Sequence, residues 1–337
     1  MKIVIALGNT ADTGGPTKYA QNLEREFIAR GHTVRFVSYA PWMWRLPSGA
    51  RHLCYMARLL PAAATSDFVF AFDTMTVGAP AVLVCTSTRT PLIIRIGGDF
   101  VWEQYVERTG DLVKLSNFYR DTVDKLSTKE RLEIWLTGVV VRHAAMLLFN
   151  SQKQRSMWQP VYRFNFNKSS VLENLYPPRK QGFPPEQRVF VSAGRPIKLK
   201  NEPLLRRVFA RLQKRYLDIV LDTESLPAKE HAERVAHCYA VIVASISEVT
   251  SNAIIDAVAY GKPFICTSDT GLVERLLGTG YFIDTQHEQE LEHAIEQLLN
   301  KEEYERVAAR VRAFAFVRTW DDIANDVLAI AQNICAL

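Results

Sequence analysis

The stretch that decides the fold covers residues 248–271, EVTSNAIIDAVAYGKPFICTSDTG. It opens with Glu248 and carries a second acid, Asp256, eight positions later. The Thr-Ser-Asn run at 250–252 is typical of a helix start, and the free N–H groups of a first helical turn can bind an anion. We therefore expect a phosphate at this helix start, with the two carboxylates beside the polar hydroxyl groups that flank it.

The sequence around this stretch alternates between short apolar runs and amphipathic segments. Residues 240–244 and 264–267 are predicted as buried strands on either side of the helix, and strand–helix–strand units build parallel sheets. The other predicted strands cover residues 2–7, 33–39, 67–72, 91–96, 145–149, 189–193, 217–221 and 281–283. The predicted fold class is therefore α/β, with doubly wound, Rossmann-like parallel sheets.

A linker is predicted at residues 176–186, which contain four prolines and one glycine. It divides the chain into an N-terminal domain, residues 1–175, and a C-terminal domain, residues 176–318, which we expect to face each other across a cleft. A last amphipathic helix within residues 319–337 is expected to pack back on the first domain. Residues 100–128 are polar and aromatic, and their pattern predicts no clear register.

Composition excludes several classes of protein. The chain has 337 residues, of which 48% are hydrophobic, so it can bury sizeable cores and is not expected to be disordered. A net charge of +5 is too modest to indicate nucleic acid as a partner. The five cysteines form no Cys/His cluster, so neither a metal site nor a disulfide framework is expected. Without a signal peptide or a membrane-spanning window, we expect a cytoplasmic protein.

Residues 41–61 combine aromatic side chains, including Trp42 and Trp44, with interleaved basic residues such as Arg45 and Arg51. One interpretation is a core helix with its entry loop. The other is an amphipathic surface that meets a membrane or a lipid-linked substrate, because tryptophan and arginine favour such an interface. In the second interpretation the protein is peripheral on the inner face of the plasma membrane.

Three further polar residues follow predicted strands. Asp99 ends a Gly-Gly-Asp run, which forms either a place where a ligand approaches the backbone closely or a plain turn with a helix cap. Arg195 and Lys200 follow the strand at 189–193, and two cations in that place suit a diphosphate. Together with the helix start at 250–252, they could stabilise a departing nucleoside diphosphate without a metal.

Five motifs in the right order resemble those of the retaining glycosyltransferases of family 4, which have the GT-B fold. They are GGP at 14–16 with Leu23 and RGHTV at 30–34, IIRIGGDF at 93–100, VLENLYPP at 171–178, SAGRPIKLKN at 192–201, and EVTSNAIIDAVAYGKP at 248–263. The resemblance covers most of the chain and implies the GT-B architecture. It also implies a nucleotide diphosphate sugar as donor and no metal or other cofactor.

The resemblance also implies roles for individual residues. It places the donor diphosphate on Arg195 and Lys200 and the transferred sugar on Glu248. It places the nucleotide ribose on Asp256, and Asp99 near the reaction centre on the acceptor side. The implied donor-binding residues also include Gly14, Gly15, Thr250, Ser251 and Asn252.

The chain departs from the family pattern in the same motifs. Asp256 stands where the family has a glutamate, Leu175 where it has the hinge glycine, and Ala244-Ser245 where it has proline–serine. Between residues 221 and 240 only one helix is predicted, where the family has a further βα unit, so the second domain is expected to be shortened.

The implied function is retaining transfer of a hexosyl-type sugar to a glycan or lipid-linked acceptor, in bacterial surface polysaccharide assembly. Two alternatives stay open. One is a sugar-nucleotide epimerase of the same fold, which releases an altered sugar without an acceptor. The other is a non-catalytic sugar-nucleotide-binding or scaffold subunit, which the shortened second domain favours.

Overall fold

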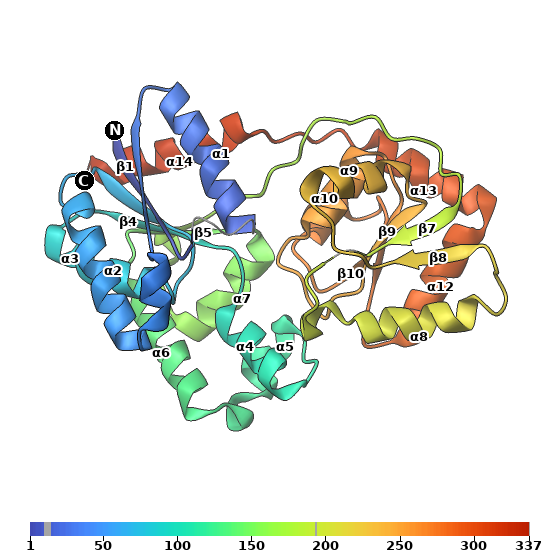
Figure 1. The fold of residues 1–337 in the computed structure, drawn as a ribbon, viewed down its shortest axis with the longest axis horizontal. Helices are drawn as coiled ribbons and strands as arrows, with labels where there is room; N and C mark the ends of the chain where they lie inside the picture. The colour runs from blue at the N-terminus through green and yellow to red at the C-terminus, as the bar shows by residue number, and fades with distance from the viewer. Residues whose placement is uncertain (10–14, 193, 337) are drawn as a thin grey trace. The chain divides into compact units, whose positions relative to one another are not determined.

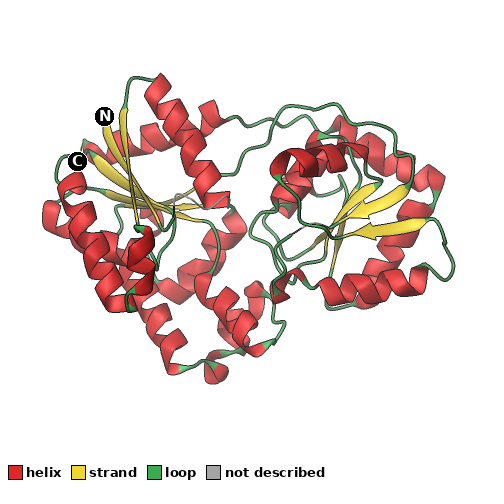
Figure 2. Cartoon of the chain, in the orientation of Figure 1, coloured by secondary structure: helices red, strands yellow, loops and turns green. Residues whose placement is uncertain are grey.

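The structure is a computed structural model that describes residues 1–9, 15–192 and 194–336. The chain divides into two compact units, each built on a parallel sheet with helices on both faces, as Figures 1 and 2 show. Unit 1 contains Met1–Val101, Asp124–Asn174 and Trp320–Leu337, and unit 2 contains Trp102–Val123 and Leu175–Thr319. The predicted α/β class with two doubly wound sheets is confirmed.

Unit 1 is built on six parallel strands in the order β2-β1-β3-β4-β5-β6. The strands are β1 (Lys2–Leu7), β2 (Thr33–Ser38), β3 (Phe68–Ala71), β4 (Leu92–Ile96), β5 (Met146–Phe149) and β6 (Ser169–Val171). Every residue of β3 and β4 is buried, because these strands lie inside the sheet and helices cover both of its faces. This double coverage explains why the strands stand out in the sequence as continuous apolar runs.

Two sets of helices cover the sheet of unit 1. Helices α1 (Gly15–Ala29) and α14 (Trp320–Cys335) pack against each other on one face. The other face carries α2 (Ser48–Ala63), α3 (Gly78–Thr88), α6 (Thr128–His143) and α7 (Gln152–Tyr162). Helix α6 begins with a capping box, in which the Ser127 hydroxyl accepts from the Glu130 N–H and the Glu130 carboxylate accepts from the Ser127 N–H.

The last helix, α14, packs against α1 within unit 1. The Trp320 and Tyr19 rings meet edge to face, with their centroids 4.8 Å apart. Arg30, just after α1, forms an ion pair with Asp321 and donates to Asn325 over 3.2 Å. These contacts tie the C-terminal segment to unit 1.

Residues 41–63 contain both features that the sequence suggests. After a short 3-10 helix (Pro41–Arg45), α2 buries Tyr55 and Leu59 completely in unit 1, as expected of a core helix. On the other side of the segment, Trp42 and Trp44 are 53% and 42% exposed, and the side chain of Leu53 is 67% exposed. The buried face packs into the core of unit 1, and the exposed aromatic face is available to a partner.

Unit 2 is built on five parallel strands in the order β11-β10-β9-β7-β8. They are β7 (Arg188–Val191), β8 (Ile219–Asp222), β9 (Ala240–Val243), β10 (Phe264–Thr267) and β11 (Tyr281–Ile283). Helices α8 (Glu202–Leu212) and α12 (Glu288–Leu299) cover one face, and α9 (Ala228–His237) and α10 (Asn252–Ala259) cover the other. Helices α11 (Val273–Leu276) and α13 (Lys301–Ala313) complete the unit. A single helix, α9, joins β8 to β9, so the second domain is shortened as the sequence predicts.

One domain boundary differs from the prediction. The residues from Trp102 to Val123 were expected in the N-terminal domain of residues 1–175, and they group with unit 2 instead. This segment contains most of α4 (Phe100–Thr109) and all of α5 (Leu115–Asp121), followed by a short 3-10 helix (Val123–Lys125). The reason is a set of hydrogen bonds to the loops of unit 2, which sequence position alone does not reveal.

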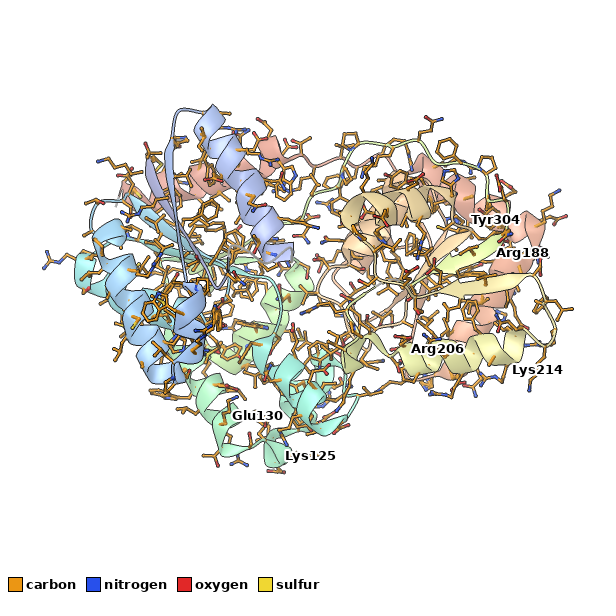
Figure 3. The ribbon with its side chains drawn as sticks, viewed as in Figure 1. Lys125, Glu130, Arg188, Arg206, Lys214 and Tyr304 are labelled. Atoms are coloured by element: carbon orange, nitrogen blue, oxygen red, sulfur yellow. The ribbon has the colours of Figure 1, made fainter. Side chains whose placement is uncertain are left out.

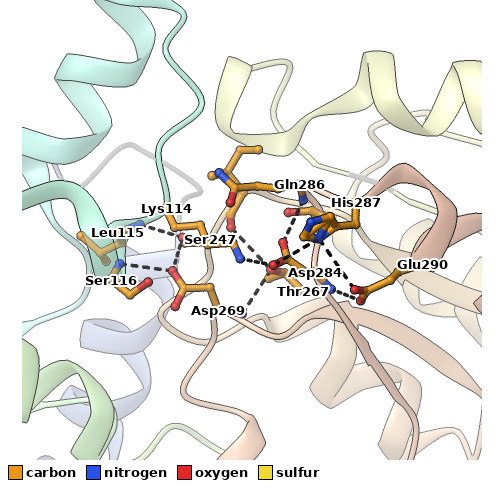
Figure 4. Close-up of polar contacts among 12 residues, drawn as sticks. Lys114, Leu115, Ser116, Ser247, Thr267, Asp269, Asp284, Gln286, His287 and Glu290 are labelled. Carbon is orange, nitrogen blue, oxygen red and sulfur yellow. Dashed lines mark hydrogen bonds and ion pairs between the residues drawn. The ribbon is translucent and has the colours of Figure 1, made fainter. Parts of the chain in front are cut away.

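An ion pair contributes to this docking, as Figure 4 shows. The Lys114 Nζ lies 2.6 Å from the Asp284 Oδ2, and the two side chains are 14% and 25% exposed. Burial by itself would raise the pKa of the Asp284 carboxyl. The hydrogen bonds from Lys114 and from the Gln286 N–H, together with the Lys114 charge, outweigh burial and hold that pKa below its ordinary value.

The start of α3 leaves no room for a side chain at Gly78. A β-carbon there would lie 2.6 Å from the backbone oxygen of Asp73. We expect Gly78→Ala to lower the free energy of unfolding by about 1–3 kcal/mol, because the backbone must shift to relieve the clash. Gly49→Ala in α2 is the matched control, since no atom lies within 4 Å of its added carbon. Urea unfolding measures both, and equal stabilities of the two variants would contradict the prediction.

The Lys114–Asp284 pair predicts a pH dependence. Because the pKa of Asp284 is lowered on folding, the pair stabilises the fold above the unfolded pKa and loses its effect as pH falls through the folded pKa. We expect Lys114→Met to cost about 1 kcal/mol at pH 7 and progressively less below about pH 4.

Urea unfolding at pH 7, 5 and 3.5 tests this dependence. The control is Lys214→Met, just after α8, whose exposed side chain takes no part in the docking (Figure 3). A deficit in Lys114→Met that does not change with pH would show that packing of the lysine stem, rather than the charge pair, holds the segment.

Candidate functional site

The candidate site lies at the carboxyl edge of the sheet in unit 2. Parallel strands all end at the same edge, and ligands of open α/β sheets bind there. Gly194 and Arg195 come after β7, followed by a 3-10 helix (Lys198–Lys200). Glu248 follows β9 and precedes α10. The topology therefore brings together three of the residues that the sequence singles out, Arg195, Lys200 and Glu248.

Glu248 is held by two side chains. The Lys200 Nζ and the Ser245 Oγ both donate to its Oε1, over 2.5 Å and 2.6 Å. The Glu248 side chain is only 13% exposed, and Ser245 is buried. The backbone of Glu248 is held as well, because its N–H donates to the Asp269 carbonyl over 3.0 Å. The carboxylate is therefore fixed in one position, as a group that orients a substrate must be.

The thiol of Cys266 lies at the end of β10, near Glu248. Burial raises the pKa of this thiol well above its ordinary value, the negative charge of Glu248 raises it further, and the Lys200 charge opposes the shift. The thiol stays protonated at neutral pH and is a poor nucleophile. Cys266 is therefore part of the apolar core of the unit.

Arg195 is exposed and ready for a ligand. Among the described residues, its guanidinium has no hydrogen-bond or ion-pair partner. Lys200 is about one-third exposed and differs from Arg195 in being paired with Glu248. The edge therefore has one arginine without a partner among the described residues, which can bind an anion, and one paired lysine, which can change partner.

Helix α10 begins close to the predicted start. Its first residue is Asn252, and Ser251 is the N-cap residue, buried at 6% exposure. The Ser251 side chain makes no capping hydrogen bond, although the residue type predicts one. Thr250 lies just before it and is half-buried. With no side-chain cap from Ser251, the first turn keeps N–H donors that suit an anion.

Asp256 lies further along α10 and has a cation beside it. The Lys180 Nζ, from the linker before β7, lies 3.7 Å from its Oδ1. The Lys180 Nζ also lies 5.0 Å from the centre of the Tyr260 ring. At 33% side-chain exposure, the Asp256 carboxylate can still be reached by a ligand hydroxyl.

The remaining predicted residues belong to unit 1 or to undescribed positions. Asp99 follows β4, directly before α4, and is 1% exposed. Gly15 is the first residue of α1. Gly14 lies outside the residues that the structure describes, so its predicted phosphate contact is not tested.

Sequence reasoning missed two polar residues behind Glu248. The Ser247 Oγ donates to the Asp269 Oδ2 over 2.5 Å, and both residues are more than 90% buried. The Ser247 Oγ accepts from the Leu115 N–H over 2.9 Å, and the Asp269 Oδ2 accepts from the Ser116 N–H over 3.3 Å (Figure 4). The rule that strand ends carry function applies to Asp269, which comes two residues after β10, and it would have found this residue.

Among the described residues, no group of three or more His, Cys, Asp or Glu side chains could hold a metal ion. Within the same part of the chain, no helix is long and apolar enough to cross a membrane.

Comparison with known proteins gives the same fold. The family model described as "Glycosyl transferases group 1" matches residues 186–301. A search of curated protein sequences found no significant relative. Sucrose-phosphate synthase from Thermosynechococcus elongatus superimposes with a TM-score of 0.72 at 12% identity, covering 100% of both chains.

Two further solved structures agree. HepE from Anabaena, in complex with UDP and glucose, has a TM-score of 0.64 at 14% identity and covers 100% of this chain and 98% of its own. WaaG, a glycosyltransferase involved in lipopolysaccharide biosynthesis, has a TM-score of 0.66 at 14% identity and covers 98% of this chain and 99% of its own. Identities this low show the fold alone. The chain thus has the GT-B fold, and its residues 186–301 match the model of the glycosyl transferases group 1 family.

Proposed function

We propose that this protein transfers a sugar from a nucleotide diphosphate sugar to an acceptor hydroxyl, with retention and without a metal. The observation that carries the proposal is the cluster of Glu248, Lys200 and Ser245, at the sheet edge where the exposed Arg195 and the start of α10 also follow their strands. All of these lie within unit 2, which contains the residues that match the glycosyl transferases group 1 model. HepE, which shares the fold, was solved with UDP-glucose, which supports this class of donor.

In the proposed complex the donor diphosphate is bound by two cations and a helix start. Arg195 has no side-chain partner among the described residues, so its fork of N–H donors can bind the phosphate oxygens. The first turn of α10, with Thr250, Ser251 and Asn252, adds backbone donors to the same anion. The Lys200 ammonium can turn from Glu248 toward the diphosphate, because its side chain is long and one-third exposed.

The reaction then needs little covalent chemistry from the protein. The bond between the anomeric carbon and the diphosphate oxygen breaks, and the acceptor oxygen bonds to that carbon. The acceptor proton passes to an oxygen of the departing diphosphate, so no separate protein base is assigned. Glu248 orients the sugar and Asp256 contacts the ribose. From the family resemblance, Asp99 is the proposed contact of the acceptor.

The proposed acceptor is a glycan or a lipid-linked sugar, and surface polysaccharide assembly is the proposed setting. Residues 40–66 contain no acidic residue but three arginines and one histidine. Trp42, Trp44 and Leu53 are exposed on the same segment, and the Arg51 guanidinium lies 4.8 Å from the Trp44 ring centre. A basic surface with exposed tryptophans suits an anionic lipid interface, so we propose peripheral binding to the inner face of the plasma membrane.

The donor site is tested by substitution at its two central residues. We expect Arg195→Ala and Glu248→Gln each to lower kcat/KM by about 100-fold or more, because each removes a preorganised contact to the donor. Lys214→Ala is the control, since it removes one exposed positive charge of the same unit away from the site. Full activity in both site variants would overturn the assignment.

The assay itself separates the three functions. Uridine, guanosine and adenosine diphosphate sugars are each incubated with and without acceptor extract, and nucleotide and sugar products are both detected. Acceptor-dependent nucleotide release supports the transferase. Nucleotide and altered sugar without acceptor indicate the epimerase, and binding without any release indicates the scaffold.

Membrane binding is tested by co-sedimentation with vesicles that contain anionic lipid. We expect binding that weakens as salt is added and that falls in the double variant Trp42→Ala/Trp44→Ala. Leu277→Ala is the control, because this leucine is 74% exposed but lies in unit 2. Binding that does not change on loss of both tryptophans would exclude this surface.

A further inference from the structure

The segment of residues 102–123 contacts the loops that carry the candidate site. Glu107 accepts from Lys198 Nζ and from the Leu199 N–H, over 2.7 Å and 3.4 Å, at the loop after β7. Lys114 pairs with Asp284 after β11. The segment therefore forms hydrogen bonds or an ion pair with the loops that follow four of the five strands of the unit, which are β7, β9, β10 and β11.

Each contact lies close to a residue of the proposed donor site. Leu199 immediately precedes Lys200, and Ser247 immediately precedes Glu248. The Asp269 carbonyl accepts from the Glu248 N–H over 3.0 Å, and Thr270 forms a parallel bridge with Glu248. A shift of the segment would therefore move the backbone on which the Lys200–Glu248 pair stands.

The start of α5 contacts two buried side chains of these loops. The first N–H groups of a helix have no partner inside it, and Lys114, the N-cap residue, provides no side-chain cap. The acceptors come instead from Ser247 and Asp269, which take the N–H groups of Leu115 and Ser116. Ser247 and Asp269 are buried, so water does not readily replace these hydrogen bonds. Separating α5 from them would therefore cost free energy.

We infer that residues 102–123 position the donor site through Ser247 and Asp269, an inference that rests on the proposed function. Ser247 and Asp269 are positioning residues. They hold the loops of β9 and β10 to α5, and so they fix the carboxylate of Glu248 and its pairing with Lys200. The segment keeps the reacting groups in place. Weakening its contacts therefore lowers kcat and leaves KM for the donor largely unchanged.

Ser247→Ala tests the inference by removing the shared hydroxyl. We expect kcat to fall about tenfold to 100-fold with little change in KM for the donor, because the fixed groups become misplaced. We expect hydrogen exchange to rise together at residues 113–118 and 246–250. Ser247→Thr keeps the hydroxyl and should restore much of both, and Arg120→Ala, on an exposed part of α5, should change neither.

The exchange measurement separates this inference from the proposed function. Glu248→Gln should lower kcat/KM by about 100-fold or more, as predicted above, and leave hydrogen exchange at residues 113–118 unchanged. An inactive wild type whose two segments still exchange together on Ser247→Ala would reject the proposed function alone. Normal kcat in Ser247→Ala, or exchange that rises at residues 113–118 only, would overturn the positioning role. If Ser247→Ala does not fold, Lys114→Met is measured in its place with the same readouts.

Discussion

Asp269 is the residue on which the carboxyl edge of unit 2 depends. Its side chain accepts from the Ser247 hydroxyl and the Ser116 N–H, and its backbone carbonyl accepts from the Glu248 N–H. A carboxylate that is 8% exposed is costly unless its oxygens are paired, so these bonds must form together. The loops after β9 and β10 and the start of α5 therefore form one hydrogen-bonded structure.

The Lys200–Glu248 ion pair and Arg195 lie at the same sheet edge but differ in their exposure to water. Glu248 has lost most of its water, and Lys200 and Ser245 replace it. Arg195 keeps its water and has no protein partner among the described residues. An incoming diphosphate would therefore compete for one cation and meet the other without competition. Such an edge favours an anion without leaving a buried charge unpaired in its absence.

Most of the fold could be predicted, because buried parallel strands leave continuous apolar runs. The bounds of β1, β10 and β11 agree with the predicted residues 2–7, 264–267 and 281–283. The strand-end rule also singled out Arg195 and Lys200, and the helix-start pattern singled out Glu248; their roles remain predictions. Neither pattern found Ser247, whose partner Leu115 is 132 positions away, because a short polar residue leaves no periodic signal. Helix α5 has only seven residues, too few for its periodicity to show, so its place in unit 2 could not be predicted.

The docking of residues 102–123 has a consequence for dissecting the molecule. The chain passes between the units at four places, after Val101, Val123, Asn174 and Thr319. A fragment that begins at the proline-rich linker would contain all five strands of unit 2 but not α5. In that fragment Asp269 and Ser247 would lose the N–H donors that pair with them. Autonomous expression of the second unit would therefore require a permuted chain in which residues 102–123 are joined to residues 175–319.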